Sequence, residues 1–357
     1  MASLKCINCG AELKYSPGAG SLKCPYCHHE NPITDSHEEI VEHEFDANLD
    51  NIESSSKTIE VSLTDCNACG AQITFSDTSV HKQCTFCGAE ITSPVHKEKV
   101  IRPESMLPFA IEKNTAAEKF TKWIKSLWFA PNKLKKTART DKLDGVYIPY
   151  WTYDAHAESD YIGQRGTHYQ VTEQYRDSEG NSKTRQVTKT KWTPASGHTK
   201  RDFDDVLVSA STSIPESLEN LLKKWDLKNL IPYNEDYFKG FNVESYNISL
   251  QDGFKKADEL MQETLEKDAK NSIGGDEQRV FSLKVAYSKI TFKHILLPIY
   301  LSSYRFNKKT YRFLVNGQNG EVQGERPWSF FKIAAAVILA AAIIGGLYYL
   351  SQYYGGQ

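Results

Sequence analysis

Eight cysteines, all within the first 87 residues, constrain this chain more than any other feature of its sequence. Each quartet has 14 residues between its two Cys-x-x-Cys pairs, and the second quartet repeats the first at an offset of 60 residues. Four thiolates at this spacing are typical of a zinc ribbon, so the pattern predicts two four-cysteine metal sites. The predicted ligands are Cys6, Cys9, Cys24 and Cys27 in the first site and Cys66, Cys69, Cys84 and Cys87 in the second.

The residue after each Cys-x-x-Cys pair supports this interpretation. Gly10, Gly70 and Gly88 follow three of the pairs, and glycine adopts positive φ without a steric penalty. Such a turn directs backbone N–H groups toward the sulfurs. His28 holds the fourth of these positions; it is an alternative metal ligand, but the quartet is already complete without it.

The chemical alternatives to zinc are disulfides and a four-thiolate iron site. Disulfides require an oxidising compartment, and the first six residues contain no apolar secretory core. Zinc is favoured over iron. Because protein ligands would saturate both sites, two structural Zn²⁺ ions are predicted rather than catalytic ones. A ribbon of this size has almost no core, so the metal would supply its folding free energy.

A second strong feature is the uncharged apolar stretch 333–350, which is long enough to cross most of a hydrocarbon core about 30 Å thick. Its span residues include Ile333, Ala334, Val337, Leu339, Ile343, Leu347 and Leu350. Interface residues are expected at Arg326, Trp328, Lys332, Tyr348 and Tyr349, where aromatic and long basic side chains meet headgroups. A buried core helix is the alternative, but only seven residues follow to cover it.

Charge predicts the orientation of this span. Lys and Arg residues precede it, whereas residues 351–357 carry no charge. The positive-inside rule then leaves the large N-terminal part in the cytoplasm and the short tail outside, in the inner or plasma membrane. A reducing cytoplasm also agrees with thiols that bind zinc.

The chain is expected to comprise five parts and to combine two small β-rich zinc ribbons, an α+β body and one C-terminal transmembrane helix. The acidic linker has eight acidic residues and no Lys or Arg in 33–56, which predicts a solvated segment. The boundaries are ribbon 1 at 1–32, linker at 33–58, ribbon 2 at 59–98, body at 99–325, and juxtamembrane segment with anchor at 326–357.

Within the body, apolar periodicity predicts three helices and several strands. A loose repeat, in which a helix precedes a proline-interrupted apolar strand and a hairpin, indicates an internal duplication; chance similarity is the alternative. Helices are expected at 114–128, 215–225 and 251–267, and strands at 145–153, 169–175, 184–192, 280–291, 295–306, 311–315 and 321–323. The helix at 114–128 is expected to be capped by Asn114 or Thr115 and stopped by Pro131.

Residues 113–142 carry nine Lys and Arg residues. Three interpretations remain open: a solvated helix face, a surface for anionic lipid, or a nucleic-acid surface. The candidate basic residues are Lys119, Lys122, Lys125, Lys133, Lys135, Lys136 and Arg139.

No catalytic motif stands out. The chain has no GxxxxGK[ST], GxGxxG, GxSxG or HExxH sequence, and all eight cysteines are assigned to metal. His198 lies in the segment 193–205, which reads as a loop, near Asp202, Asp204 and Asp205. That segment is the weak candidate for an enzyme site; the expectation is that the protein is not an enzyme and has no small-molecule substrate.

Several phrases beyond the cysteines carry a family resemblance. They include MLPF at 106–109, GVYIPYWTYDA at 145–155, FDDVLVSAS at 203–211, KHILLPIY at 293–300 and GERPWSFFKI at 324–333. Together they resemble a bacterial family of membrane-anchored double zinc-ribbon proteins, often labelled as primosomal replication-restart helicase-like or as TFIIB-type zinc ribbon proteins. The resemblance implies this architecture over essentially the whole chain. It does not imply helicase activity, because this chain lacks the P-loop lysine and is too short for two RecA-like lobes.

Three functions follow as hypotheses. The first is a non-enzymatic adaptor on the cytoplasmic membrane face, whose zinc ribbons recruit a protein partner. The second is a membrane-tethered nucleic-acid binder, which the ribbon half disfavours because residues 1–98 carry 6 Lys and Arg against 15 Asp and Glu. The third is an enzyme of unknown class.

Overall fold

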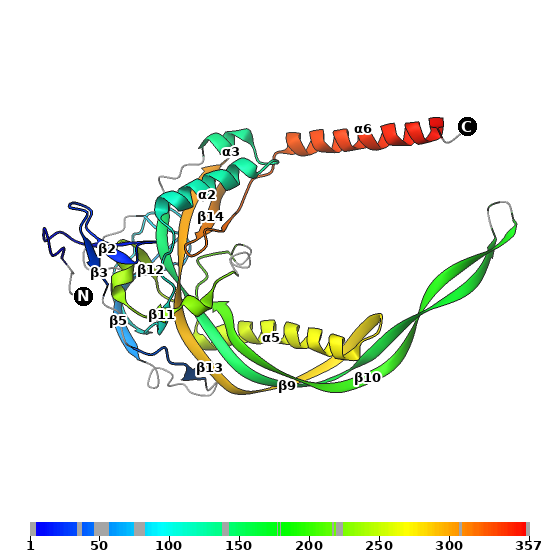
Figure 1. The fold of residues 1–357 in the computed structure, drawn as a ribbon, viewed down its shortest axis with the longest axis horizontal. Coiled ribbons are helices and arrows are strands. Elements are labelled where there is room, and N and C mark those ends of the chain that lie inside the picture. The colour runs from blue at the N-terminus through cyan, green and yellow to red at the C-terminus, as the bar shows by residue number, and fades with distance from the viewer. Residues whose placement is uncertain are drawn as a thin grey trace.

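The structure is a computed structural model, and it describes residues 5–33, 38–45, 57–74, 83–137, 143–176, 178, 180–215, 218, 224–306 and 309–354. Three long antiparallel strands form its frame, each several times the usual strand length of about five or six residues. The central one is β9 (Asp144–Arg176), with β10 (Ser182–Ser209) on one side and β13 (Glu277–Phe306) on the other. Figure 1 shows them bending together into an arch.

Bulges provide local bends in these long strands. The ladder shifts register between Phe203 and Val206 in β10 and between Ser288 and Thr291 in β13. Asp205 and Lys289, which lie within those shifts, adopt φ of +51°, a left-handed conformation typical of bulges and turns.

Helix α5 (Leu250–Ile273) lies in the hollow of this arch (Figure 1). Ser249 caps its first turn by accepting from Asp252 N, and the helix ends at Gly274, whose φ is +63°. Its buried residues recur at helical spacing, so one stripe faces the strands. They are Leu250, Gly253, Ala257, Met261, Leu265, Ala269 and Ile273.

The long strands belong to a larger mixed sheet that runs in the order β11-β8-β13-β9-β12-β6-β5-β7. The shorter members are β4 (His43–Glu44), β5 (Thr58–Asp65), β6 (Gln72–Thr74), β7 (His96–Ile101), β8 (Ser105–Met106), β11 (Ile231–Pro232), β12 (Asn242–Glu244), β14 (Lys309–Asn316) and β15 (Val322–Gly324). A separate sheet holds β1 (Lys14–Ser16), β2 (Ser21–Lys23) and β3 (Glu30–Pro32).

Two prolines mark the places where the long strands change neighbours. β9 pairs with β12 at residues 146–147 and with β10 from Tyr150 onward, and Pro149 lies between these ladders. β13 pairs with β8 at residues 295–296 and with β14 from Ile299 onward, and Pro298 lies between. A proline is tolerated there because the position falls between two ladders.

The surroundings of these prolines are alike. Ala210 N donates to Pro149 O at 3.0 Å, and Gly317 N donates to Pro298 O at 2.8 Å. β12 runs parallel to β9, and β8 runs parallel to β13. A helix precedes each of these two proline-containing strands: α2 (Lys113–Ser126) comes before β9, and α5 comes before β13.

Several expected elements need correction. The strand expected at 145–153 continues through Pro149 to Arg176, and the strands expected at 280–291 and 295–306 are one strand, because the partner switch accommodates the proline and the bulge carries the register shift. The segment 193–205, expected as a loop, is part of β10. The hairpin expected at 169–192 is the distal end of β9 and β10.

The helices differ from expectation mainly at their ends. α2 begins one residue early, after Glu112, and no side-chain cap bond forms there, so Asn114 and Thr115 are not its caps. A further helix, α3 (Asn132–Thr137), follows Pro131. Most of the helix expected at 215–225 lies outside the described residues; short 3₁₀ helices follow at Leu227–Asn229 and Glu235–Phe238.

The segment expected as a solvated acidic linker is bound to the body over residues 38–45. β4 pairs with β13 opposite Thr291 and Phe292, and Phe45 N donates to Ile290 O at 2.9 Å. Glu42 pairs with the buried Lys293 at 2.9 Å. Glu38 and Glu42 are therefore paired with Arg102 and Lys293 of the body, and linker residues 34–37 and 46–56 lie outside the described residues.

Candidate metal centres and membrane segment

The first four cysteines converge on one point. Cys6 Sγ lies 3.6 Å from Cys27 Sγ, and Cys9 Sγ lies 3.5 Å from Cys24 Sγ. All four sulfurs lie within 4.8 Å of one another. The cysteines come from the two turns that flank the β1–β2 hairpin.

The second four cysteines repeat this arrangement. Cys66 Sγ lies 3.6 Å from Cys87 Sγ, and Cys69 Sγ lies 3.7 Å from Cys84 Sγ. A tetrahedron with metal–sulfur bonds of about 2.3 Å has edges of about 3.8 Å. The donor set and its spacing therefore fit zinc in both centres.

The turn that presents each cysteine pair has the same backbone geometry in all four cases. Gly10, His28, Gly70 and Gly88 have φ between +60° and +74°. Each donates its N–H to the carbonyl of the first cysteine of its pair, at 2.8 to 3.1 Å. His28 thus fills a backbone role like that of the three glycines, and the four-thiol group does not include it.

Neighbouring thiols shift the pKa values of the second centre in opposite directions. A hydrogen bond from the Cys84 thiol lowers the pKa of Cys69 to about 5, and the same contact, followed by burial, raises the pKa of Cys84. Burial raises the pKa of Cys87 to about 11. Four thiolates in so small a volume repel one another, so they ionise together when a cation balances their charge.

The first ribbon rests against the body through one strand. Tyr15 of β1 donates its N–H to Lys239 O at 2.9 Å and its hydroxyl to Phe109 O at 3.1 Å. Its ring contacts Tyr237 and Phe241, with centroid separations of 4.9 and 6.3 Å. This ribbon keeps its own three-stranded sheet.

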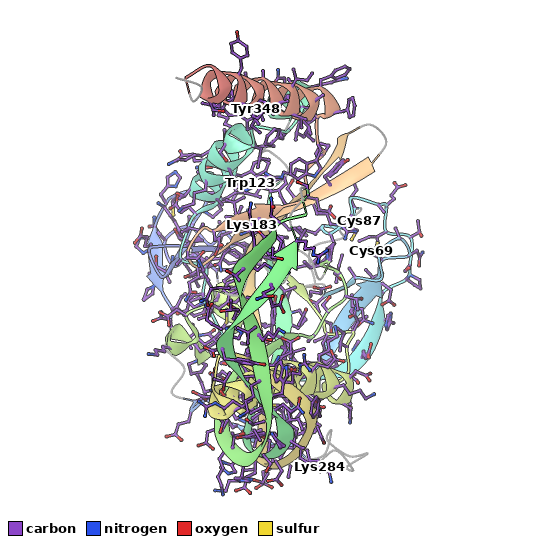
Figure 2. The ribbon with its side chains drawn as sticks, turned by 90° about the vertical axis from the view of Figure 1, so that its right-hand side faces the viewer. Cys69, Cys87, Trp123, Lys183, Lys284 and Tyr348 are labelled. Carbon is purple, nitrogen blue, oxygen red and sulfur yellow. The ribbon has the colours of Figure 1, made fainter. Side chains whose placement is uncertain are left out.

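The second ribbon is built into the main sheet. β6 pairs with β12, which pairs with β9, and β5 pairs with β7. β7 runs across the boundary expected at residues 98 and 99. Phe86 is 1% exposed and belongs to the same core as Ile148 of β9. Figure 2 shows Cys69 and Cys87 side by side at one flank of the molecule.

One helix of the described chain is long and apolar enough to cross a membrane, over Phe330–Tyr349. It forms the first 20 residues of α6 (Phe330–Tyr354), and none of these residues is buried in the rest of the chain. All seven expected span residues fall in α6, although the side chain of Leu350 lies outside the described part. Arg326 lies over the Trp328 ring, 4.5 Å from its centroid.

Lys332 lies differently from the other expected interface side chains. Lys332 Nζ donates to Trp128 O at 3.1 Å, to Ala130 O at 2.9 Å and to Asn132 Oδ1 at 2.8 Å, so it holds the α2–α3 turn instead of extending freely. Ser329 N also donates to Phe129 O at 2.8 Å. Tyr348 and Tyr349 are exposed near the far end of α6.

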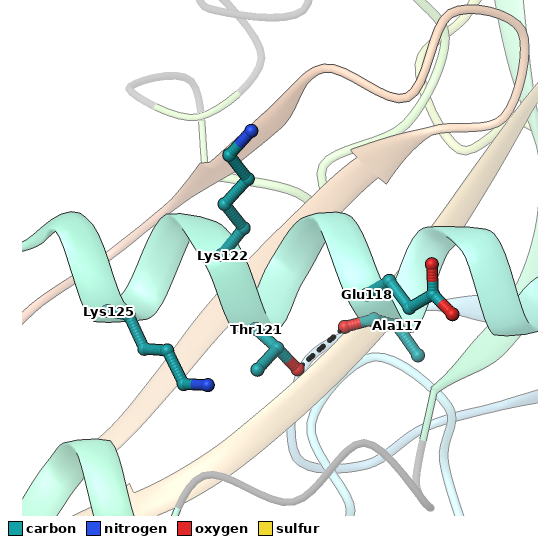
Figure 3. A pocket seen from close by; sticks show the side chains of 5 residues that line it. All are labelled: Ala117, Glu118, Thr121, Lys122 and Lys125. Carbon is teal, nitrogen blue, oxygen red and sulfur yellow. Dashed lines mark hydrogen bonds between the residues drawn. The ribbon is translucent and has the colours of Figure 1, made fainter.

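The expected basic surface follows the outer face of α2 and the start of α3. Figure 3 shows Lys122 and Lys125 extending from α2 beside a hollow of about 390 Å³, which Ala117, Glu118 and Thr121 complete. Lys119 and Lys133 belong to the same helices. The side chains of Lys135 and Lys136, and all of Arg139, lie outside the described residues.

The weak enzyme candidate at 193–205 does not form the expected cluster around His198. His198 Nδ1 lies 2.8 Å from Asp160 Oδ1, whereas His156 Nδ1 lies 2.5 Å from Asp202 Oδ1. Asp204 and Asp205 instead lie with Asp154 beside the β10 bulge. Each pair joins directly opposed residues of β9 and β10. His198 and Asp202 lie four residues apart along β10, about 13 Å at 3.3 Å per residue, so they do not meet.

The sequence reasoning missed that Trp128 and Phe129 lie beside the start of α6, where Lys332 Nζ donates to Trp128 O and the Phe129 ring lies 6.3 Å from that of Trp328. They follow the last buried residue of α2's apolar face and precede Pro131, so the helical periodicity assigns neither of them to that face. Two large aromatic side chains that fall outside the apolar face of the helix were therefore the available signal that they are exposed.

Comparison with known proteins adds one relative. The chain is 25% identical over 343 residues to the Uncharacterized protein YdjG of Bacillus subtilis (strain 168), which covers 93% of this chain and 92% of that protein. No family model matches the chain. No solved structure matches it.

Proposed function

We propose that this protein is a zinc-stabilised, membrane-anchored adaptor that recruits a protein partner at the cytoplasmic face. The observation that carries the proposal is the pairing of two four-thiol centres, each with a complete donor set, with an exposed apolar helix on one chain. Zinc suits the centres because its preferred tetrahedral thiolate geometry matches their spacing. The role requires no catalytic step.

The proposal assigns a different role to each ribbon. Ribbon 1 exposes a large apolar side chain in each knuckle: Ile7 is 80% exposed and Tyr26 is 79% exposed. In ribbon 2 the residue that corresponds to Tyr26 is Phe86, which is buried against the body. Ribbon 2 is therefore proposed to support the fold, and the tip of ribbon 1 is proposed to contact the partner through these two exposed side chains.

The orientation follows from charge. Arg312 and Arg326 precede α6, and Lys332 lies in its first turn. Positive charge on this side is retained in the cytoplasm, so α6 would place the ribbons and the arch inside the cell. The reducing cytoplasm keeps the eight thiols available for metal.

The test is affinity capture of the full chain from detergent-solubilised native membranes. The double variant Ile7→Ser/Tyr26→Ser leaves all eight cysteines in place and is expected to lose the partner while it retains two zinc ions and membrane localisation. Val95→Ser, which also removes an exposed apolar side chain, is the matched control. Equal capture by the double variant and the control would contradict the adaptor role of ribbon 1.

We also infer that the body arose by duplication of a helix, a long strand and a hairpin. The matching surroundings of Pro149 and Pro298 support this, as do the two parallel pairings β8–β13 and β12–β9. In the first unit the helix is α2 and in the second it is α5. Each unit would contribute one long strand to the centre of the sheet.

A specific surface favours a second candidate, a membrane-tethered nucleic-acid binder. Beyond Gly166, where β13 stops pairing, residues 167–176 and 182–191 form a two-stranded arm (Figure 1). Side chains of paired strands alternate between two faces. One face carries Tyr169, Val171, Glu173, Tyr175, Lys183, Arg185, Val187, Lys189 and Lys191; the other carries mainly Gln and Thr.

Basic and aromatic side chains on one face suit a nucleic-acid backbone and its bases. Glu173 partly offsets the charge, because it pairs with Lys189 at 2.9 Å and Arg185 at 3.5 Å. The full chain in nanodiscs is expected to bind DNA or RNA with an affinity that falls as salt rises. Lys183→Gln/Lys189→Gln/Lys191→Gln should reduce that slope, and Gln170→Ser/Gln186→Ser on the other face should not. Salt-independent binding, or none, rejects this candidate.

A further inference from the structure

Two large aromatic side chains are exposed at the turn between α2 and α3. Trp128 is 76% exposed and Phe129 is 36% exposed. Transfer of such apolar side chains out of water is favourable, so a surface that covers them is stabilised by the contact. Their backbone is fixed, because Ala130 N donates to Leu127 O at 3.2 Å and Leu134 N to Pro131 O at 3.0 Å.

This turn lies against the first turn of α6. Phe129 and Trp328 have ring centroids 6.3 Å apart, and Ser329 N donates to Phe129 O at 2.8 Å. The Lys332 ammonium donates all three of its hydrogen bonds to this corner: two to backbone carbonyls of the turn and one to Asn132 Oδ1. The two segments, 200 residues apart in sequence, are therefore held as one corner.

Exposed aromatic residues continue without a break from this turn onto the helix. Trp328 is 57% exposed, and Phe330 and Phe331 are more exposed still. We call the set Trp128, Phe129, Trp328, Phe330 and Phe331 the aromatic corner. On one side of the aromatic corner lie the backbone carbonyls of the turn and the Lys332 ammonium that they bind. On its other side lies the part of α6 that follows Lys332, which carries no charge.

We infer that the aromatic corner is a second membrane contact, in which Trp128 and Phe129 enter the boundary between headgroups and acyl chains beside the start of α6. This inference rests on the proposed function, in which α6 crosses the bilayer. Trp is favoured at that boundary because its ring is apolar and its N–H is polar. Continuity with α6 identifies the bilayer, rather than a protein partner, as the surface that covers the turn.

Lys332 is the positioning residue of this contact. A lysine at the start of a span ordinarily reaches out to the headgroups. Here its ammonium is occupied by the turn, so it fixes the depth of Trp128 relative to α6. Loss of the ammonium would release the turn without shortening the apolar span.

The test is tryptophan quenching in the full chain reconstituted into nanodiscs made with brominated phosphatidylcholine. Bromine at shallow acyl positions is expected to quench part of the emission in the natural sequence more strongly than bromine at deep positions. Trp128→Phe should remove a large share of that quenched component. Trp225→Phe is the matched control, because Trp225 packs against the body core and should leave the quenched component unchanged.

Lys332→Met provides the second variant. It should reduce the quenching of Trp128 while α6 stays inserted, which resistance to alkaline carbonate extraction reports. If carbonate releases the natural protein, the membrane anchor itself is wrong. If the protein resists extraction and Trp128→Phe leaves the quenched component intact, the anchor stands and the aromatic corner is not a membrane contact.

Discussion

Gly253 of α5 lies so close to Trp151 of β9 that a methyl group on its α-carbon would be 2.7 Å from the indole Cδ1. The same methyl group would lie 2.5 Å from the hydroxyl oxygen of Tyr153. That hydroxyl donates to Leu250 O, and the indole N–H donates to Ile248 O, so neither ring moves freely. The glycine sets the distance between α5 and the arch.

Gly253→Ala is therefore expected to destabilise the protein although alanine favours helix formation by about 1 kcal/mol. Overpacking of a core costs typically about 1 to 3 kcal/mol, which outweighs that gain. Thermal unfolding followed by circular dichroism should show a lower midpoint. Gly345→Ala in α6 is the matched control, since nothing lies within 4 Å of its added methyl group. An unchanged or higher midpoint for Gly253→Ala would mean that α5 can shift away from the strands.

The two metal centres should differ in what their loss does to the fold. Cys66→Ser is expected to lower the unfolding midpoint of the whole protein, because β5 and β6 belong to the main sheet. Cys6→Ser should loosen ribbon 1 alone, which has its own small sheet. Each variant should lose one zinc ion by metal analysis. Gln83→Ser, beside a ligand but exposed, should lose neither zinc nor stability. Equal drops for both cysteine variants would contradict this division.

The two four-thiol groups and the apolar helix were predictable because their signals are local. The spacing of the cysteines identifies the four thiols of each group. The residue that follows each Cys-x-x-Cys pair completes the turn with a positive φ, even where that residue is His28. Uninterrupted apolar sequence marks α6 in the same way. These features depend on neighbours a few residues away.

The long strands were not predictable because they depend on distant partners. Pro149 has no N–H to donate, so the sequence predicts that the strand is interrupted there. The strand continues because its partner changes at this point from β12 to β10. Binding of residues 38–45 likewise depends on Lys293, some 250 residues further along. The sequence of the acidic segment does not itself indicate that Glu42 pairs with a buried lysine.

A carboxylate near that lysine makes stability depend on pH. Burial, reinforced by the carboxylate of Glu42, raises the pKa of Asp154 from 3.8 to about 6. Lys293 and Asp205 face the same group, and Asp205 N donates to Asp154 Oδ1 at 2.6 Å. The folded state therefore holds a proton on Asp154 more tightly than the unfolded chain does. This contribution to stability is complete below pH 3.8 and is lost as pH rises through about 6.

Asp154→Asn removes that titration and keeps an oxygen that accepts from Asp205 N. The natural protein should lose stability relative to the variant between pH 5 and pH 8. Unfolding midpoints of both proteins at the two pH values measure the effect, and other titrating groups cancel in the difference. A stability difference that is the same at both values would show that Asp154 does not titrate in this range.

The direction of α6 leads to the last prediction. In Figure 1, α6 and the arm both extend from the body toward the same side. A bilayer crossed by α6 in that direction would also enclose much of the arm, whose Lys183, Arg185 and Lys189 exclude it from hydrocarbon. Insertion should therefore swing α6 away from the arm, and the α2–α3 turn, which Lys332 holds against the first turn of α6, should move with it. Spin labels on unnatural residues at Gln186 and Tyr349, which leave the cysteines untouched, should lie farther apart in nanodiscs than in the structure. A label pair at Gln186 and Lys267 should match the structure. If both pairs match, the arm and α6 keep this arrangement, and α6 cannot cross a bilayer from this body.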